Sequence, residues 1–151
     1  MLTLTRPLLA GICALAFAVG LSACAETAST NNFKGESHNV AQTVSNFQTD
    51  ATAEDEKKLC EDDLAATLTA KLARAGGCQA VLKTQLHEID ALGLTIESIS
   101  VNGAHALAHV KSTYSGKSRI STFALVKEGT RWKISGLVGF SVAPSATSKK
   151  S

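Results

Sequence analysis

The sequence predicts an α+β domain in which helices come first and a four-stranded antiparallel meander follows. Up to about residue 91, apolar side chains recur at helical spacing, and from residue 94 the period is closer to two. Three turn dipeptides then divide the second half at regular spacing: Asn102-Gly103, Ser115-Gly116 and Glu128-Gly129. Helices followed by a run of strands indicate a layer of helices packed on one sheet.

Three helices are expected, over 37–49, 61–75 and 78–91, with a short helical turn capped by Thr52 between the first two. In the first helix, Val40, Val44 and Phe47 fall on one stripe. The pair Gly76-Gly77 ends the second helix, because glycine readily adopts the left-handed conformation of a helix stop. The acidic run over 54–63 is expected to be a solvated helix surface.

Four strands are expected, over 94–101, 104–114, 117–127 and 130–138. If each turn is a two-residue loop, Ala108 lies opposite Phe123, Leu125 lies opposite Trp132, and Ile99 lies opposite Ala106. One face then gathers Ile99, Val101, Ala104, Ala106, Ala108, Val110, Phe123, Leu125, Trp132 and Ile134. A slip of one residue would scatter these side chains over both faces, so we expect this face to form the core.

The N-terminal segment has the order of an export signal. Arg6 precedes an uncharged apolar run over 8–21, which is shorter than the roughly 20 residues that span a bilayer as a helix. It ends in Leu21-Ser22-Ala23-Cys24, which resembles the lipobox of a bacterial lipoprotein. The resemblance implies removal of residues 1–23 and acylation of Cys24, with a diacylglycerol and often a further chain such as palmitate. The alternative is an ordinary secretory signal cut near Cys24, which would leave a plain thiol.

These features predict the organisation of the chain. Residues 1–23 are the signal peptide, 24–36 the lipidated cysteine with a flexible polar tether, 37–140 the folded domain, and 141–151 a disordered tail. The expected location is the extracytoplasmic face of a bacterial membrane. In an oxidising compartment, Cys60 and Cys78 most simply form a disulfide.

Charge is unevenly distributed along the chain. Residues 25–90 hold 11 acidic and 6 basic residues, whereas 91–151 hold 2 acidic and 8 basic ones. The two halves of one fold can attract each other in this way, or a basic surface can face anionic lipid headgroups. Nucleic acid is not an expected partner, because no basic run is interleaved with aromatic residues.

The end of the meander carries a family resemblance. The segment Val126-Lys127-Glu128-Gly129-Thr130-Arg131-Trp132-Lys133-Ile134, after a helical half with paired cysteines, resembles the NTF2-like superfamily and its small extracytoplasmic lipoproteins. The resemblance implies a curved sheet wrapped around helices as a cone, often with a pocket inside. It leaves the function open, because this scaffold hosts enzymes, carriers and oligomerisation domains alike.

Glu97 is the candidate pocket acid. In the expected register it faces inward opposite Ala108, near Phe123 and Trp132, where it could transfer protons as in ketosteroid-isomerase-like enzymes. The alternative is a place at the sheet rim in contact with water. Because Glu97 has no evident catalytic partner, a non-enzymatic module that binds a small apolar ligand or a protein is the leading expectation. An enzyme and a homodimer formed through the sheet are the alternatives, and no cofactor or metal is expected.

Overall fold

The computed structural model describes residues 28–86, 93–114 and 117–138, and it has the predicted α+β order. The helical half comprises α1 (Glu36–Thr52), α2 (Glu56–Lys58), the π-helix η1 (Leu59–Asp63), α3 (Ala66–Arg74) and α4 (Cys78–Leu86). The strands are β1 (Gly93–Asn102), β2 (His105–Tyr114), β3 (Lys117–Glu128) and β4 (Arg131–Val138), in the order β1-β2-β3-β4. The predicted signal peptide, Cys24 and the tail lie outside the described residues.

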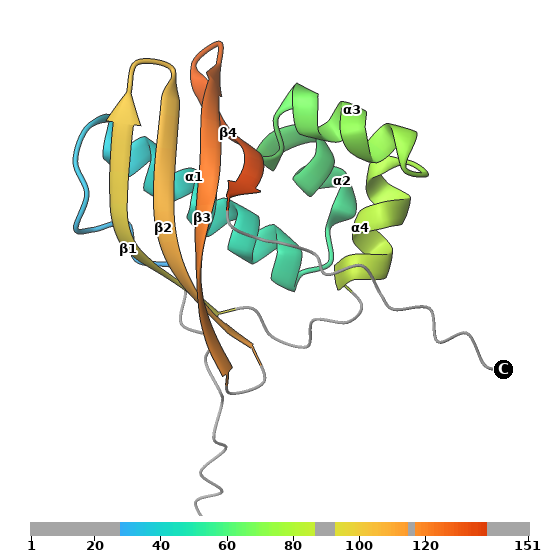
Figure 1. Ribbon diagram of the computed structural model, residues 1–151, viewed down its shortest axis with the longest axis horizontal. Helices are drawn as coiled ribbons and strands as arrows, with labels where there is room; N and C mark the ends of the chain where they lie inside the picture. The colour runs from blue at the N-terminus through green and yellow to red at the C-terminus, as the bar shows by residue number, and fades with distance from the viewer. Residues whose placement is uncertain (1–27, 87–92, 115–116, 139–151) are drawn as a thin grey trace, which may run out of the picture.

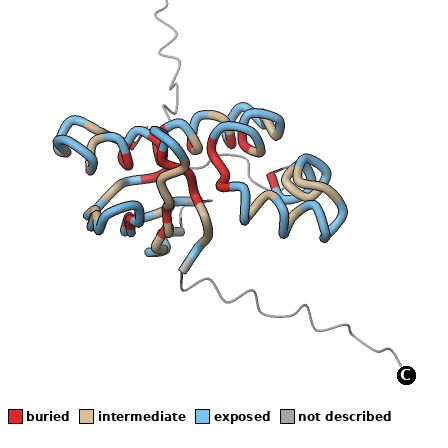
Figure 2. Tube along the Cα trace, turned by 90° about the horizontal axis from the view of Figure 1, so that it is seen from above, coloured by how far each residue is buried: buried red, intermediate tan, exposed pale blue. Residues whose placement is uncertain are grey.

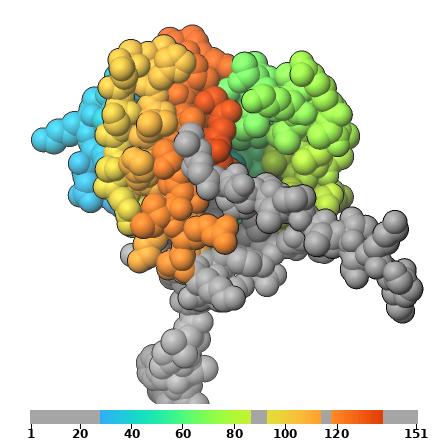
Figure 3. All heavy atoms as spheres, viewed as in Figure 1, coloured from blue at the N-terminus to red at the C-terminus, as the bar shows by residue number. Residues whose placement is uncertain are grey.

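Helix α1 covers one face of the sheet, and the core lies between these two layers (Figures 1 and 2). Val40 and Val44 are fully buried, as their stripe predicts, and the ring of Phe47 meets that of Phe123 edge-on with 5.6 Å between centroids. The opposite face of β1 and β2 is turned to the viewer in Figure 3, with no helix over it. The sheet therefore has one face in the core and one that the helices leave open.

The helices differ from expectation around residue 60. Thr52 does not cap a helix but is the last residue of α1, and Asp55 caps α2 by accepting a hydrogen bond from Lys58 N. The helix expected over 61–75 is divided, because η1 ends with a bond from Leu64 N to Leu59 O, five residues back. Only its second part, α3, is an α-helix.

The β2–β3 register is confirmed, with Ala108 opposite Phe123. The other two registers are wrong by two residues next to their turns, where Ile99 lies opposite Ala108 and Leu125 lies opposite Ile134, and each register shifts by one more residue at an irregularity farther along the strand pair. The reason lies in the position of the glycine in each two-residue loop. Gly103, with a φ of 58°, takes the first position of the β1–β2 loop rather than the second, and Gly129 does the same in the β3–β4 loop. A shift of two preserves the face of every side chain, so the predicted core face forms except at Ala104, which is exposed in the turn.

A β-bulge at Glu97 changes the parity of β1. Ile96 pairs with Val110 and Ser98 pairs with His109, so Glu97 is the extra residue with no partner opposite it. The bulge lets Leu94 and Ile96 join the core together with Ile99, and it leaves the side chain of Glu97 exposed. The prediction that Glu97 faces inward is therefore wrong.

A disulfide and a buried N-terminal residue add contacts at the periphery of the domain. The predicted Cys60–Cys78 disulfide is present and joins η1 to the start of α4. Ala28 falls in the range expected to be a flexible tether, yet it is 4% exposed and belongs to the core cluster. Its N–H donates to Gln48 Oε1 over 2.8 Å. The folded domain therefore begins by Ala28, earlier than the sequence indicates.

Candidate functional site

The pocket predicted around Glu97 does not assemble. Ala108, Phe123 and Trp132 are buried and packed into the main core, whereas Glu97 is exposed at its bulge. Their side chains fill the space between α1 and the sheet, where an apolar ligand was expected. The candidate site lies elsewhere, in a polar groove between α1, η1 and the β3–β4 turn.

This groove has a volume of about 290 Å³ and draws on three separate segments of the chain. It is lined by Asn39, Gln42, Thr43, Asn46, Asp62, Asp63, Thr130, Arg131 and Trp132. The α1 residues recur at helical spacing, so they form one polar stripe beside the buried one. Helix α1 thus faces the core with one side and the groove with another.

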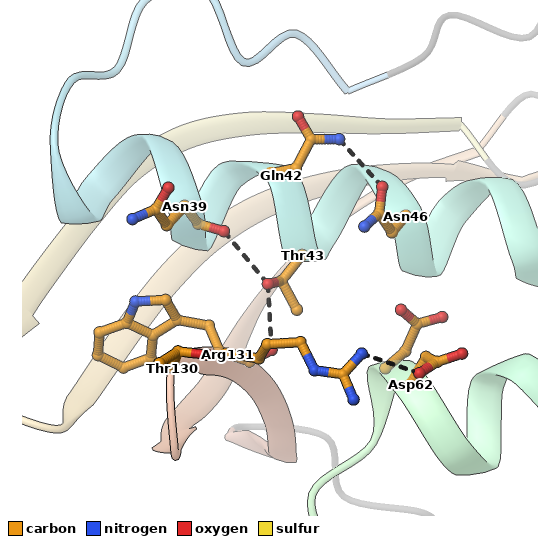
Figure 4. A pocket seen from close by; sticks show the side chains of 9 residues that line it. Asn39, Gln42, Thr43, Asn46, Asp62, Thr130 and Arg131 are labelled. Atoms are coloured by element: carbon orange, nitrogen blue, oxygen red, sulfur yellow. Dashed lines mark hydrogen bonds and ion pairs between the residues drawn. The ribbon is translucent and has the colours of Figure 1, made fainter.

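The wall formed by α1 offers amide groups (Figure 4). Gln42 Nε2 donates to Asn46 Oδ1 over 3.0 Å, and both side chains are exposed. That bond uses one donor of Gln42 and the acceptor of Asn46. The Gln42 carbonyl oxygen and the Asn46 N–H groups then remain as an acceptor and donors for a ligand.

The opposite wall carries charge. Arg131 Nη1 lies 3.0 Å from Asp62 Oδ1, and this ion pair joins the start of β4 to η1 (Figure 4). Both side chains are at least half exposed, so the pair is open to solvent and adds little to stability. Thr43 holds the floor, since its hydroxyl bonds to Trp132 O over 3.2 Å. The walls are therefore pinned to each other by specific polar contacts.

Asp63 is a buried carboxyl group at the base of the groove. It is 3% exposed, and its Oδ2 atom has no hydrogen-bond partner among the described residues. Burial, followed by the negative charge of the neighbouring Asp50, raises the pKa of Asp63 to about 7. The ammonium group of Lys133 opposes that effect, and it also donates to Glu61 O. This environment favours the neutral form of the Asp63 carboxyl group, and its Oδ2 atom is shielded from solvent.

Glu36 holds Trp132, one of the residues that line the groove. Its Oε2 accepts from Trp132 Nε1 over 2.6 Å, and its Oε1 accepts from Lys127 Nζ over 2.7 Å. The Lys127 ammonium also lies 5.8 Å from the centre of the Trp132 ring, within range of a cation–π contact. Hydrogen bonds from Lys127 and Trp132 hold the pKa of Glu36 below its usual value. These contacts fix the Trp132 ring beneath the groove.

The arrangement has the groups that bind a polar ligand. Amide, hydroxyl, carboxylate and guanidinium groups together provide donors and acceptors for a polar ligand, and they lie on rigid elements. Within the described ranges, no three His, Cys, Asp or Glu side chains come together as a metal site would require. None of the described helices has the length and apolar character needed to cross a membrane.

The sequence reasoning missed the groove. It treated the acidic run over 54–63 as a solvated surface, which is wrong at Asp63, and it gave Glu36, Asp50 and Arg131 no role. The available signal was the row of amides and hydroxyls on α1, from Asn39 to Asn46, next to the buried stripe. A scan of the sequence against protein-family models finds no match, and a search of curated proteins finds none of significant similarity.

Proposed function

We propose that this protein is a lipid-anchored, extracytoplasmic binding module whose polar groove receives an extended segment of a partner protein. The observation that carries the proposal is the groove itself, which is lined on α1 by the Gln42–Asn46 amide pair and on its other side by the Asp62–Arg131 ion pair. The proposal keeps the predicted non-enzymatic role and replaces the apolar ligand with a polar one. The proposal also includes an NTF2-like scaffold, which is compatible with the order of the elements: helices first, then a four-stranded antiparallel meander.

A peptide segment suits the dimensions and chemistry of the groove. From Asn39 to Asn46 the wall extends about 10 Å along α1, which is the length of about three residues of extended chain. A peptide backbone presents alternating N–H and C=O groups, and the amides of Gln42 and Asn46 can pair with both kinds. Arg131 and Asp62 can each exchange their exposed ion pair for a charged side chain of the partner.

Export and lipidation come from the sequence, and the disulfide supports them. The Cys60–Cys78 bond is typical of a protein that folds outside the cytoplasm. Acylation of Cys24 would keep the domain at the membrane surface. Metabolic labelling with a fatty-acid analogue tests this directly, since label should enter the wild type and not a Cys24→Ser variant.

The open face of the sheet supports a second candidate, a homodimer. Leu107 is 42% exposed there, and a shallow depression of about 390 Å³ lies around it, Ala124 and Ser135. Exposed apolar side chains on a sheet face are a common basis for pairing between copies. Dimerisation through this face would leave the groove free, so the two candidates can be distinguished.

Native mass spectrometry of the full lipidated chain, solubilised from its own host membranes, separates the candidates. The groove proposal predicts one copy of the chain with an additional polypeptide component. That component should disappear in Gln42→Leu and persist in Gln79→Leu, which changes an exposed glutamine on α4 away from the groove. Two copies of the chain, returned to one by Leu107→Lys, would support the dimer instead. A lipidated monomer alone would contradict both.

A further inference from the structure

The β2–β3 end of the sheet has features of a membrane-contact surface. In Figure 1 the β2–β3 hairpin extends downward beyond the helices. Lys111 and Arg119 are exposed near that end, and Ile120, opposite Lys111, is 66% exposed. Between Ser98 and Lys127 the sequence contains no acidic residue. This end of the sheet is therefore basic with an exposed aliphatic side chain.

The chain also enters the domain toward this end. The blue segment that leads into α1 begins behind the lower half of the sheet in Figure 1. Ala28 is fixed there by burial and by its bond to Gln48. Only residues 25–27 separate it from Cys24, so the two Cα atoms can be at most about 14 Å apart.

We propose that the end of β2 and β3 that carries Lys111, Arg119 and Ile120 rests on anionic lipid headgroups as a second membrane contact beside the acylated Cys24. The inference rests on the lipidation of Cys24 that the proposed function includes. A link this short cannot hold the domain away from the bilayer, because acyl chains place the Cys24 sulfur at the headgroup level. Basic side chains gain attraction to an anionic surface within a Debye length, and Ile120 can enter the interface.

This contact sets the orientation of the groove. Thr130 and Arg131 lie at the β3–β4 turn, which is at the upper end of the sheet in Figure 1, opposite the β2–β3 hairpin. A domain that stands on the hairpin therefore directs the groove away from the membrane. A partner would reach it from the extracytoplasmic space.

The test uses the full lipidated protein in vesicles of phosphatidylglycerol and phosphatidylcholine. An environment-sensitive fluorophore is attached at Ser118→Cys on the hairpin or, as the matched control, at Ala104→Cys in the β1–β2 turn. Both positions are exposed, and Cys60 and Cys78 are protected from labelling by their disulfide. The probe at 118 should shift to shorter wavelength and be quenched by spin-labelled headgroups, whereas the probe at 104 should not respond.

Two further variants separate charge from tethering. Lys111→Glu combined with Arg119→Glu should abolish the response at 118 while the protein still floats with the vesicles. Inserting twelve Gly and Ser residues before Ala28 should weaken the response without altering the domain. Equal responses at 118 and 104 in a floating protein would overturn the hairpin contact alone. A chain that takes up no acyl label and does not float would overturn the anchor, and with it both proposals.

Discussion

Trp132 donates its indole N–H to Glu36 over 2.6 Å, and this bond ties β4 to the first residue of α1. The second carboxylate oxygen of Glu36 binds Lys127, which lies opposite Trp132 in the β3–β4 pairing. One carboxylate therefore holds both members of a cross-strand pair. Glu36 therefore joins α1, which forms one wall of the groove, to Trp132, which lines its floor.

Glu36→Gln should lower the midpoint of urea unfolding at neutral pH, because it removes the charge that Lys127 and Trp132 both meet. Trp132 is the single tryptophan of the chain, so its emission should shift in the same variant. The pKa of Glu36 is depressed in the folded state, so its stabilisation is present above its usual pKa and is lost as the pH falls. An unchanged midpoint and an unchanged emission spectrum would contradict this role.

Asp63→Asn should remove a pH dependence of stability. The folded pKa of Asp63 is raised from 3.8 to about 7, so the wild type is expected to lose stability as the pH rises across that window. The variant should lack this loss and be more stable than the wild type above pH 7, by a few kcal/mol at most, since one pKa unit corresponds to about 1.4 kcal/mol. Urea unfolding at several pH values measures it.

The matched control for that experiment is Asp62→Asn, on the neighbouring and exposed position. Its ion pair with Arg131 is open to solvent, so we expect a change below about 1 kcal/mol. Because the charge of Asp62 also contributes to the raised pKa of Asp63, the loss of stability with rising pH should persist in this variant and be slightly smaller. If both variants show the same pH profile as the wild type, the burial of Asp63 has no energetic consequence.

Reduction of the Cys60–Cys78 disulfide should lower the free energy of unfolding by about 3 kcal/mol, because the bond closes a loop with a sequence separation of 18. Cys60→Ala combined with Cys78→Ala should reproduce the loss. The measurement is chemical unfolding with and without reductant, preceded by a count of free thiols. Two free thiols in the unreduced, lipidated protein would contradict the bond.

Glu97 and Phe123 were predicted to share a pocket, but in the structure Glu97 is exposed and Phe123 is buried. Substitutions at the two positions should therefore differ in their effect on stability. Phe123→Ala should cost about 3–5 kcal/mol, because it empties a buried position in contact with Phe47. Glu97→Ala should change stability by no more than about 0.5 kcal/mol, as expected of an exposed side chain. Thermal unfolding of both variants checks this, and a large loss in Glu97→Ala would mean that its carboxylate is structural.

The sequence was informative wherever a period or a pairing rule applied. Helical spacing located α1, the Gly76-Gly77 pair marked the end of α3, and the two cysteines predicted their own bond. Turn dipeptides located the strands but not the register, because a glycine can occupy either position of a two-residue loop. Two registers were therefore displaced; the faces were preserved next to the turns and changed beyond the bulge at Glu97.

The remaining features had no local signal. A bulge inserts one residue without changing composition, so the outward turn of Glu97 could not be read from alternation. The run Glu61-Asp62-Asp63 is uniformly acidic, and only the π-turn of η1 determines that Asp63 is buried. Ala28 contacts the core through one small side chain and one backbone hydrogen bond. A single residue of this kind gives no periodic pattern in the sequence.

Photo-cross-linking at the groove in intact cells tests the central claim most directly. A photoreactive phenylalanine analogue is placed at Thr130, an exposed residue that lines the groove, or, as the matched control, at Gln79. The groove proposal predicts that irradiation joins the chain to one defined polypeptide from position 130 and not from position 79. The yield should fall in an Arg131→Ala background, where the opposite wall has lost its charge. Absence of an adduct at 130, or identical adducts from both positions, would contradict a binding groove.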